Sequence, residues 1–200
     1  MLKAELRNLQ PSELVFGAGV AARGLRDNPM AAAVLGDDPR HRERNLQRTF
    51  GAYLRKVKHA PLAAWRGDYV IGIVGMAPPG TCQISGFEML TMFPRARPTR
   101  VGDVIRTMRW LSDWEKRDLK EPHWHVGPVA VEGGLQGMGI GSQLMAAFAE
   151  QMDRDRTTAY LETDKLRNVV FYERFGFEVI DEAEVLDTPN WFMRRPPAAS

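Results

Sequence analysis

The most informative candidate for a functional site is a glycine-rich segment, Gln136-Gly137-Met138-Gly139-Ile140-Gly141. The apolar stretch 126–131 predicts a strand before it, and the amphipathic stretch 140–153 predicts a helix after it. Glycine lets a backbone approach a ligand closely, and the first N–H groups of a helix lack partners within the helix. The segment is therefore predicted to bind an anion, in particular a phosphate group.

Two common phosphate-binding patterns do not fit this segment. A P-loop requires a lysine after its last glycine, whereas Ser142 follows Gly141. A dinucleotide fingerprint that starts at Gly137 has Ser142 at its final glycine position, and one that starts at Gly139 has Leu144 there. The segment also lies far along the chain, behind several other elements. Neither nucleotide fold is predicted.

Two histidines precede the glycine-rich segment. His123 and His125 alternate along the predicted strand, so their side chains share one face. A histidine with a pKa near its reference value of ~6.5 suits a general base at neutral pH, although a structural hydrogen bond explains such a residue equally well. A His-x-His pair can also hold a metal, but no cysteine or carboxylate cluster in the sequence completes a ligand set, so no metal site is predicted.

A second segment carries polar groups on a short helix. Residues 160–164 predict a strand, and residues 168–175 predict a helix that Gly176 ends. Asn168 and Tyr172 are four residues apart and therefore lie on the same side of this helix.

Together, the two segments resemble the acyl-CoA-binding motifs of the GNAT superfamily of N-acyltransferases. Gln136, Gly139 and Gly141 match the pattern Q/R-x-x-G-x-G/A, and residues 168–177 match N…F-Y-x-x-x-G-F. The similarity extends to the group around puromycin N-acetyltransferase through residues 40–44, 124–141, 161–163, 171–177 and 191–194. It is strong over residues 123–177 and weak before about residue 100.

The resemblance implies that acetyl-CoA is the cosubstrate and that no metal takes part. It implies that Tyr172 is the general acid for the CoA thiolate and that Asn168 contacts the pantetheine arm. Many members place a base at the position of His125, and Glu162, one strand over, is the rival base. The implied acetyl-CoA-binding residues are Val129, Ala130, Val131, Gln136, Gly137, Met138, Gly139, Ile140, Gly141, Ser142, Asn168 and Tyr172.

Gly127-Pro128 lies in the middle of the predicted strand 123–131. Proline cannot donate to a neighbouring strand, so pairing must be interrupted there, either by a bulge or edge position or by strands that separate. The resemblance implies separation around pantetheine, with the backbone groups of Val129 and Val131 facing the CoA arm and the Val129 N–H polarising the acetyl oxygen.

The remaining pattern predicts an α/β fold. We expect a GNAT-type mixed, mostly antiparallel sheet with helices on both faces and a splayed central strand pair. A single domain, 1–200, would contain an acyl-CoA-binding core, 126–177, and a frayed tail, 196–200. Predicted helices span 11–26, 40–58, 101–117, 140–153 and 168–175; predicted strands span 2–9, 62–65, 69–76, 123–131, 159–164, 177–186 and 190–195. Residues 80–100 are expected to be irregular.

Composition narrows the classes of function. The formal net charge is +2 and the two signs are mixed, so no nucleic-acid partner is expected. The only cysteine, Cys82, excludes an internal disulfide and suits a reducing compartment. No signal segment or apolar run of the ~20 residues that span a bilayer is present, so we expect a cytoplasmic protein without a membrane partner. The oligomeric state stays open, with a homodimer as one option.

We therefore expect an N-acetyltransferase that moves an acetyl group from acetyl-CoA to a primary amine of a small molecule by direct attack. The acceptor pocket is expected from residues 20–60, 80–100 and 187–190. One alternative acceptor is a protein N-terminus or lysine, and a second alternative is a CoA-binding sensor without catalysis.

Overall fold

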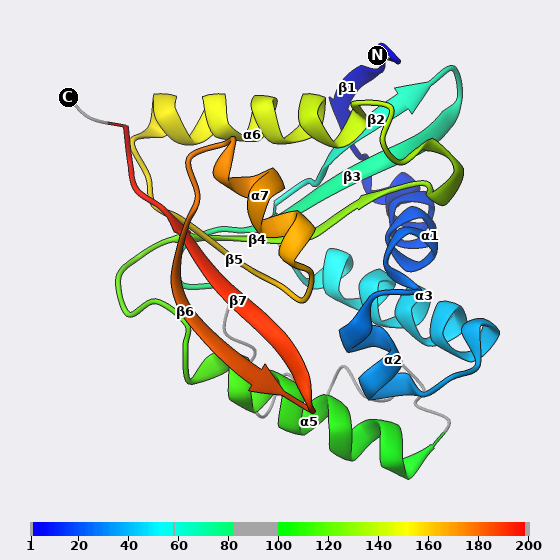
Figure 1. Cartoon of the computed structure of the whole chain (residues 1–200). Helices are drawn as coiled ribbons and strands as arrows, with labels where there is room; N and C mark the ends of the chain where they lie inside the picture. The colour runs from blue at the N-terminus through cyan, green and yellow to red at the C-terminus, as the bar shows by residue number, and fades with distance from the viewer. Residues whose placement is uncertain (1, 58, 82–99, 199–200) are drawn as a thin grey trace.

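The computed structural model describes residues 2–57, 59–81 and 100–198. Seven strands form one sheet in the order β1-β2-β3-β4-β5-β7-β6, and only the β4–β5 pair is parallel (Figure 1). The strands are β1 (Glu5–Asn8), β2 (Leu62–Arg66), β3 (Tyr69–Ala77), β4 (Trp124–Val131), β5 (Ala159–Thr163), β6 (Glu178–Val185) and β7 (Thr188–Arg195). The α-helices are α1 (Leu14–Leu25), α2 (Pro29–Leu35), α3 (Pro39–Lys56), α5 (Val101–Glu115), α6 (Ile140–Asp155) and α7 (Leu166–Glu173).

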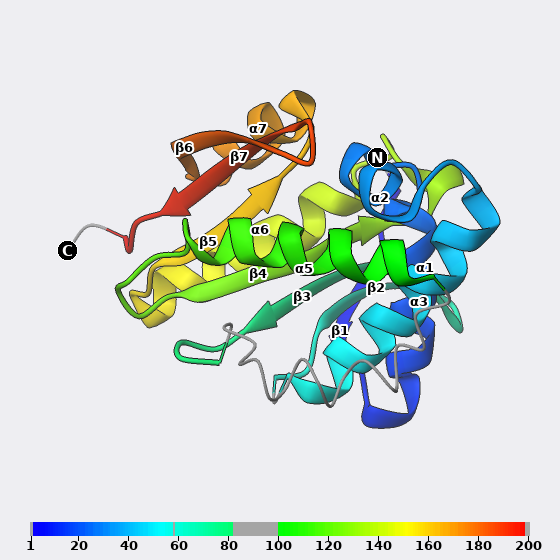
Figure 2. The ribbon, with the colours of Figure 1, turned by 90° about the horizontal axis from the view of Figure 1, so that it is seen from below.

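Helices cover both faces of the sheet. Ile73 of β3 packs in one buried cluster with α1 and α3 residues, and its neighbour Val74 packs in another with α6 and α7 residues. This division follows from the strand geometry, because successive side chains point to opposite faces. Figure 2 shows α6 and α7 on one side of the sheet and α1 and α3 on the other. The predicted α/β class, with a mixed and mostly antiparallel sheet, is confirmed.

The central parallel pair separates soon after it begins. The β4–β5 pairing comprises only Trp124 with Ala159 and His125 with Tyr160. Gly127-Pro128 follows immediately, and the pairing of β4 with β3 is also irregular between Val74 and Met76. At Gly75 an added Cβ would lie 2.5 Å from the Gly127 carbonyl oxygen, so only glycine fits there. The proline segment therefore combines the two predicted alternatives, a splay toward β5 and an irregularity toward β3.

Helix α1 contains three glycines that weaken a helix prediction, yet the helix forms. Two of them allow close packing against the sheet. An added Cβ at Gly17 would lie 2.6 Å from a Leu9 methyl, and one at Gly24 would lie 2.7 Å from the Val131 carbonyl oxygen. The propensity cost of glycine is about 1 kcal/mol per position, which tertiary packing overrides here. The glycines bring α1 against β4 beside the splay.

Helix α2 is missing from the predicted helices, because Asn28-Pro29 and Gly36 are residues typical of loops. The structure makes them the two ends of a helix. Pro29 occupies the first turn, where its missing N–H costs nothing, and Gly36 ends the helix with a φ of 78°. Short helices bounded in this way are hard to distinguish from loops by sequence.

Helix α5 spans most of the predicted 101–117 range, but its buried side differs from expectation. The apolar residues Val101, Ile105 and Met108 are 77%, 62% and 48% exposed, whereas Asp103 is 2% exposed. Asp103 binds His41 of α3 and Arg106 of its own helix at 2.6 Å each. Polar contacts, not an apolar stripe, hold this side of α5. Most of the expected irregular segment 80–100 lies outside the described residues.

Candidate active site

The glycine-rich segment forms a tight turn at the start of α6. Gly137 and Gly139 have φ angles of 81° and 86°, in the left-handed region that favours glycine. Gly139 is the residue that caps α6, and no side chain accepts from the first helical N–H groups. These amides and the helix dipole together favour an anion at this point. Binding of a phosphate by residues 136–142 stays a prediction.

The segment just before β1 supports this turn. The Leu2 N–H donates to the Met138 carbonyl at 3.0 Å, and the Gln143 side chain bonds Leu2 and Ala4. The turn is therefore fixed on both sides before any ligand arrives. No sequence motif indicated this connection, which joins residues far apart in the chain.

The end of β4 directs some backbone groups into the splay. The Glu132 N–H bonds the Ile71 carbonyl at 3.0 Å, so by the alternation of antiparallel strands Ala130 also faces β3. The backbone groups of Val129 and Val131 then face away from β3, toward the gap beside β5. The Gln136 side chain donates to the Val131 carbonyl at 3.2 Å and to the Gly24 carbonyl at 3.4 Å. Gln136 thus joins the turn, β4 and α1.

His125 and Glu162 meet where the central strands begin to separate. Their contact joins His125 Nε2 to Glu162 Oε2 at 3.0 Å, with side chains 22% and 3% exposed respectively. His125 belongs to the last β4–β5 pair, and Glu162 lies two residues beyond its partner Tyr160. The two residues that the sequence offered as rival bases are therefore in direct contact and form an ion pair when His125 is protonated.

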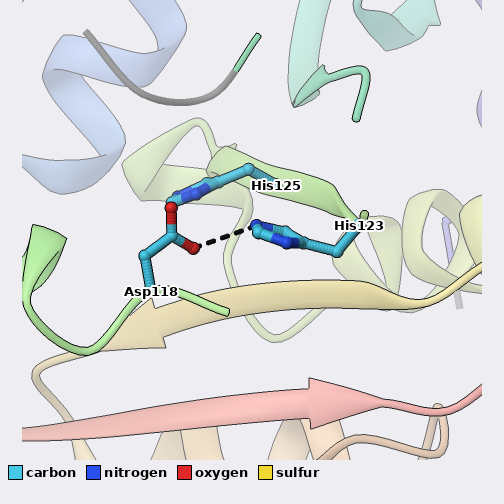
Figure 3. Close-up of side chains that lie close together, drawn as sticks. All are labelled: Asp118, His123 and His125. Atoms are coloured by element: carbon cyan, nitrogen blue, oxygen red, sulfur yellow. Dashed lines mark ion pairs between the residues drawn. The ribbon is translucent and has the colours of Figure 1, made fainter. Parts of the chain in front are cut away.

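His123, the other histidine, lies beside this pair (Figure 3). Its Nε2 is 2.9 Å from Asp118 Oδ1, and its Nδ1 is 2.8 Å from the Glu121 carbonyl oxygen. Burial of Asp118 favours the neutral carboxyl, but the hydrogen bond from His123 and the charges of both histidines outweigh burial and lower the pKa of Asp118. Asp118 precedes β4 in a loop and had no sequence signal.

Tyr172 lies on α7 with its ring packed between Phe171 and Phe177. Burial, and secondarily the charge of Asp164, raises the pKa of Tyr172. No hydrogen bond from its hydroxyl is found within the described ranges. Asn168 donates through Nδ2 to Thr163 Oγ1 at 3.0 Å. The side-chain amide of Asn168 therefore connects α7 to the end of β5. The sequence did not suggest this structural contact.

One groove among the described residues lies elsewhere. It measures about 390 Å³, lies between α1 and α3, and includes Arg44, Arg48 and Arg55. None of the predicted site residues lines it. We place the candidate site at the splay because the turn, the His125–Glu162 pair and the unpaired edge of β4 converge there. In the described part of the chain, no helix is both long enough and apolar enough to cross a bilayer.

Comparison with known proteins agrees with this architecture. Residues 28–177 match the model of the acetyltransferase (GNAT) family. A histone acetyltransferase HPA2-related protein from Corynebacterium glutamicum superposes with a TM-score of 0.72 at 18% identity, covering 100% of this chain and 99% of that one. The polyamine N-acetyltransferase of Drosophila melanogaster, which forms N-acetylagmatine, has a TM-score of 0.64 at 16% identity over 97% and 100% of the two chains.

A GNAT family acetyltransferase from Brucella melitensis, solved with acetyl-CoA, is similar at a TM-score of 0.55 and 16% identity over 99% and 90% of the chains. These identities establish a shared fold and leave the acceptor open. The family match covers most of the chain and includes both motifs. This protein belongs to the GNAT family and is an acyl-CoA-dependent acetyltransferase.

Proposed function

We propose that this enzyme transfers the acetyl group of acetyl-CoA to a primary amine of a small molecule by direct attack in a ternary complex. The observation that carries this proposal is that α5 is attached to β7 on one side and to α2 on the other (Figure 1). Trp114 Nε1 donates to Asn190 Oδ1 of β7 at 3.2 Å, and Arg106 Nε donates to the Val34 carbonyl of α2 at 2.7 Å. If the acceptor binds near residues 187–190, as expected from the sequence, α5 would close the side on which an extended peptide would need an open groove.

The donor would bind along β4, with its pyrophosphate on the amides of residues 137–142. The backbone of Val129 and Val131 would hold the pantetheine arm, and the Val129 N–H would polarise the acetyl oxygen. Gly141 lies with its α-carbon facing Phe171 and Val131, since an added Cβ would be 3.5 Å and 3.7 Å from their side chains. The turn thus lies next to α7, which carries Tyr172.

The His125–Glu162 pair would accept the proton of the attacking amine, directly or through a water molecule. Glu162 is almost fully buried and His125 presents the more exposed part of the pair. An imidazolium formed at His125 would be stabilised by the Glu162 carboxylate, since opposite charges in contact favour the charged forms. In this proposal, His125 and Glu162 act together as the base.

Tyr172 would protonate the departing thiolate. The new N–C bond forms as the thioester C–S bond breaks; the amine proton goes to the base pair and the sulfur takes the Tyr172 proton. Because burial raises the pKa of Tyr172, its hydroxyl stays protonated and can act as the donor. No covalent enzyme intermediate is needed.

The test is a panel of amines assayed with acetyl-CoA for thiol release, with mass spectrometry of the products. It should include agmatine and polyamines, because a similar structure acts on them, and peptides with free N-termini and lysines, because another is related to a histone acetyltransferase. We expect one or more small amines to gain a single acetyl group. Preferential acetylation of the peptides would contradict the small-molecule assignment.

A further inference from the structure

Three metal-binding side chains converge beside the candidate active site. Asp118, His123 and His125 each offer a ligand atom, and these atoms all lie within 4.8 Å of one another. Figure 3 shows the Asp118 carboxylate between the two imidazole rings, with one oxygen turned toward His123. The sequence suggested a His-x-His pair but no third ligand, and the loop before β4 supplies it.

In each histidine, one ring nitrogen contacts a group outside the three-residue cluster, as is usual for metal-bound histidines. The Glu121 carbonyl can only accept, so His123 Nδ1 must carry the hydrogen at 2.8 Å from it, and Nε2 faces Asp118. His125 Nε2 faces Glu162 at 3.0 Å, and its Nδ1 on the other side of the ring is buried. A ligand bond through His125 Nδ1 leaves the contact with Glu162 intact.

The charge and burial of this group favour a cation. Asp118 and His123 side chains are 8% and 4% exposed, and the Glu162 carboxylate nearby is 3% exposed. Two buried carboxylates beside two imidazoles need positive charge, which either protons or a metal ion can supply. Two imidazoles and one carboxylate are a ligand set typical of Zn²⁺, whereas Mg²⁺ and Ca²⁺ prefer oxygen ligands.

The distances are close to those of a zinc site. Zinc bonds to nitrogen and carboxylate oxygen of about 2.0–2.2 Å place tetrahedral ligand atoms roughly 3.3 Å apart. The Asp118–His123 contact at 2.9 Å is slightly shorter, and the widest separation in the group is below 4.8 Å. Side-chain rotation would have to bring the widest pair of ligand atoms up to about 1.5 Å closer together around an ion.

We propose that Asp118, His123 and His125 bind a Zn²⁺ ion, with the Glu121 carbonyl and the Glu162 carboxylate as outer partners that orient the two histidines. The fourth position is left for water or another small ligand. This assignment concerns binding and does not depend on the identity of the acceptor amine. With an ion on Nδ1 and Glu162 at Nε2, both ring nitrogens of His125 are engaged, so the Glu162 carboxylate would be the member of the proposed base pair that accepts the amine proton.

Metal binding can be measured without an activity assay. Chelator-treated protein is titrated with Zn²⁺ by calorimetry, and we expect one equivalent to bind. Asp118→Asn keeps the size of the side chain but weakens its bond to the metal. Loss of a residue that only orients a ligand already lowers metal affinity about tenfold, so loss of a ligand charge should lower the Zn²⁺ affinity by at least that much. His59→Gln is the matched control: His59 packs edge-to-face against Trp124 outside the cluster, and its removal should leave affinity unchanged.

A second measurement needs no variant and avoids any loss of folding. The four histidine rings of the wild-type protein are followed by NMR during a Zn²⁺ titration. The signals of His123 and His125 should change, while those of His41 and His59 should not. Absence of stoichiometric binding, or binding that shifts His41 or His59 instead, would overturn the proposal, as would equal affinity in wild type and Asp118→Asn.

Discussion

At the scale of single residues, the hydroxyl of Tyr172 has one predicted task. Tyr172→Phe keeps the ring that packs against Phe171 and Phe177, so fold and acetyl-CoA affinity should be nearly unchanged. Proton transfer to a leaving group is worth about 10²–10⁴ in rate, and water can replace part of it, so we expect kcat to fall at least about tenfold. Unchanged kcat in a chemistry-limited assay would leave Tyr172 with a packing role alone.

The His125–Glu162 pair should respond as one unit. His125→Ala and Glu162→Gln should each lower kcat by about 10²-fold or more, and the double variant should lose little beyond the stronger single change. Steady-state kinetics with all three proteins measures this coupling. His59→Ala provides a histidine control outside the pair. Multiplying rather than overlapping losses would mean that the two residues act separately.

Residue-level prediction from sequence reaches as far as a motif fixes a position and stops where the fold brings distant residues together. Motifs and strand alternation predict roles for Gln136, His125, Glu162 and Tyr172, and these roles stay predictions. Asp118 could not be found, because a lone aspartate in a loop carries no periodic signal. Asn168 was predicted to contact the CoA arm, which stays a prediction, while its bond to Thr163 depends on how α7 packs.

At the scale of elements, the turn before α6 gives the clearest test of donor binding. Gly139 has a positive φ, so any side chain there strains the backbone whether or not CoA binds. Gly141 is the better position: an added Cβ meets only ordinary contacts at 3.5 Å and beyond. Gly141→Ala should keep the fold and weaken CoA binding about tenfold, the loss of one charge-assisted hydrogen bond.

The control for this variant is Gly134→Ala in the same loop region, where an added Cβ meets nothing within 4 Å. Calorimetric titration with CoA compares both variants with wild type. If Gly141→Ala bound CoA as tightly as Gly134→Ala, the pyrophosphate would have to lie elsewhere.

The junction between α1 and α2 should be sensitive to acid. Asp27 bonds Arg26 and then Arg42, and these contacts lower the pKa of Asp27 to about 2. A lowered folded-state pKa stabilises the fold above the unfolded value near ~3.8 and loses that effect as pH falls toward 2. Asp27→Asn should therefore be less stable than wild type at pH 7 and converge with it near pH 2.

Denaturant unfolding of the two proteins across this pH range measures the convergence. Asp27 is more than half exposed, so the difference at pH 7 should stay below about 1 kcal/mol. If the difference in stability between wild type and Asp27→Asn did not change with pH, the loss would come from the altered shape of the side chain and not from its charge.

Prediction of the elements shows why local signals mislead. The glycines of α1 reduce helix propensity but are required for contact with β3 and β4, which no local window contains. Pro29 and Gly36 mark helix ends and loops alike. By contrast, the alternation in β4 and the helical spacing in α6 are strong local patterns, so the elements around the donor site were predicted closely.

At the scale of the whole molecule, α5 joins α2 and α3 to β7 through polar contacts. Asp103 is buried between His41 and Arg106, so Asp103→Ala leaves two donors without their partner. Removing one member of a buried ionic group costs about 3–5 kcal/mol, and the exposure of Arg106 places the expected loss nearer the lower end. Thermal or denaturant unfolding measures it.

Asp113→Ala is the matched control on the same helix, because Asp113 pairs with Lys116, whose side chain is 65% exposed. That change should cost less than about 1 kcal/mol. Hydrogen exchange should also rise along α5 in Asp103→Ala only. Equal stability of the two variants would show that α5 is held mainly by its aromatic contacts.

The support that the segment before β1 gives to the glycine-rich turn has a practical consequence for handling the protein. Leu2 contacts both Met138 and Gln143, so a tag fused ahead of Leu2 would lie close to the turn that is proposed to bind the CoA pyrophosphate. We expect such a tag to weaken CoA binding, whereas a tag placed after β7 should not. Comparing the CoA affinity of the two tagged forms measures how much the segment before β1 contributes.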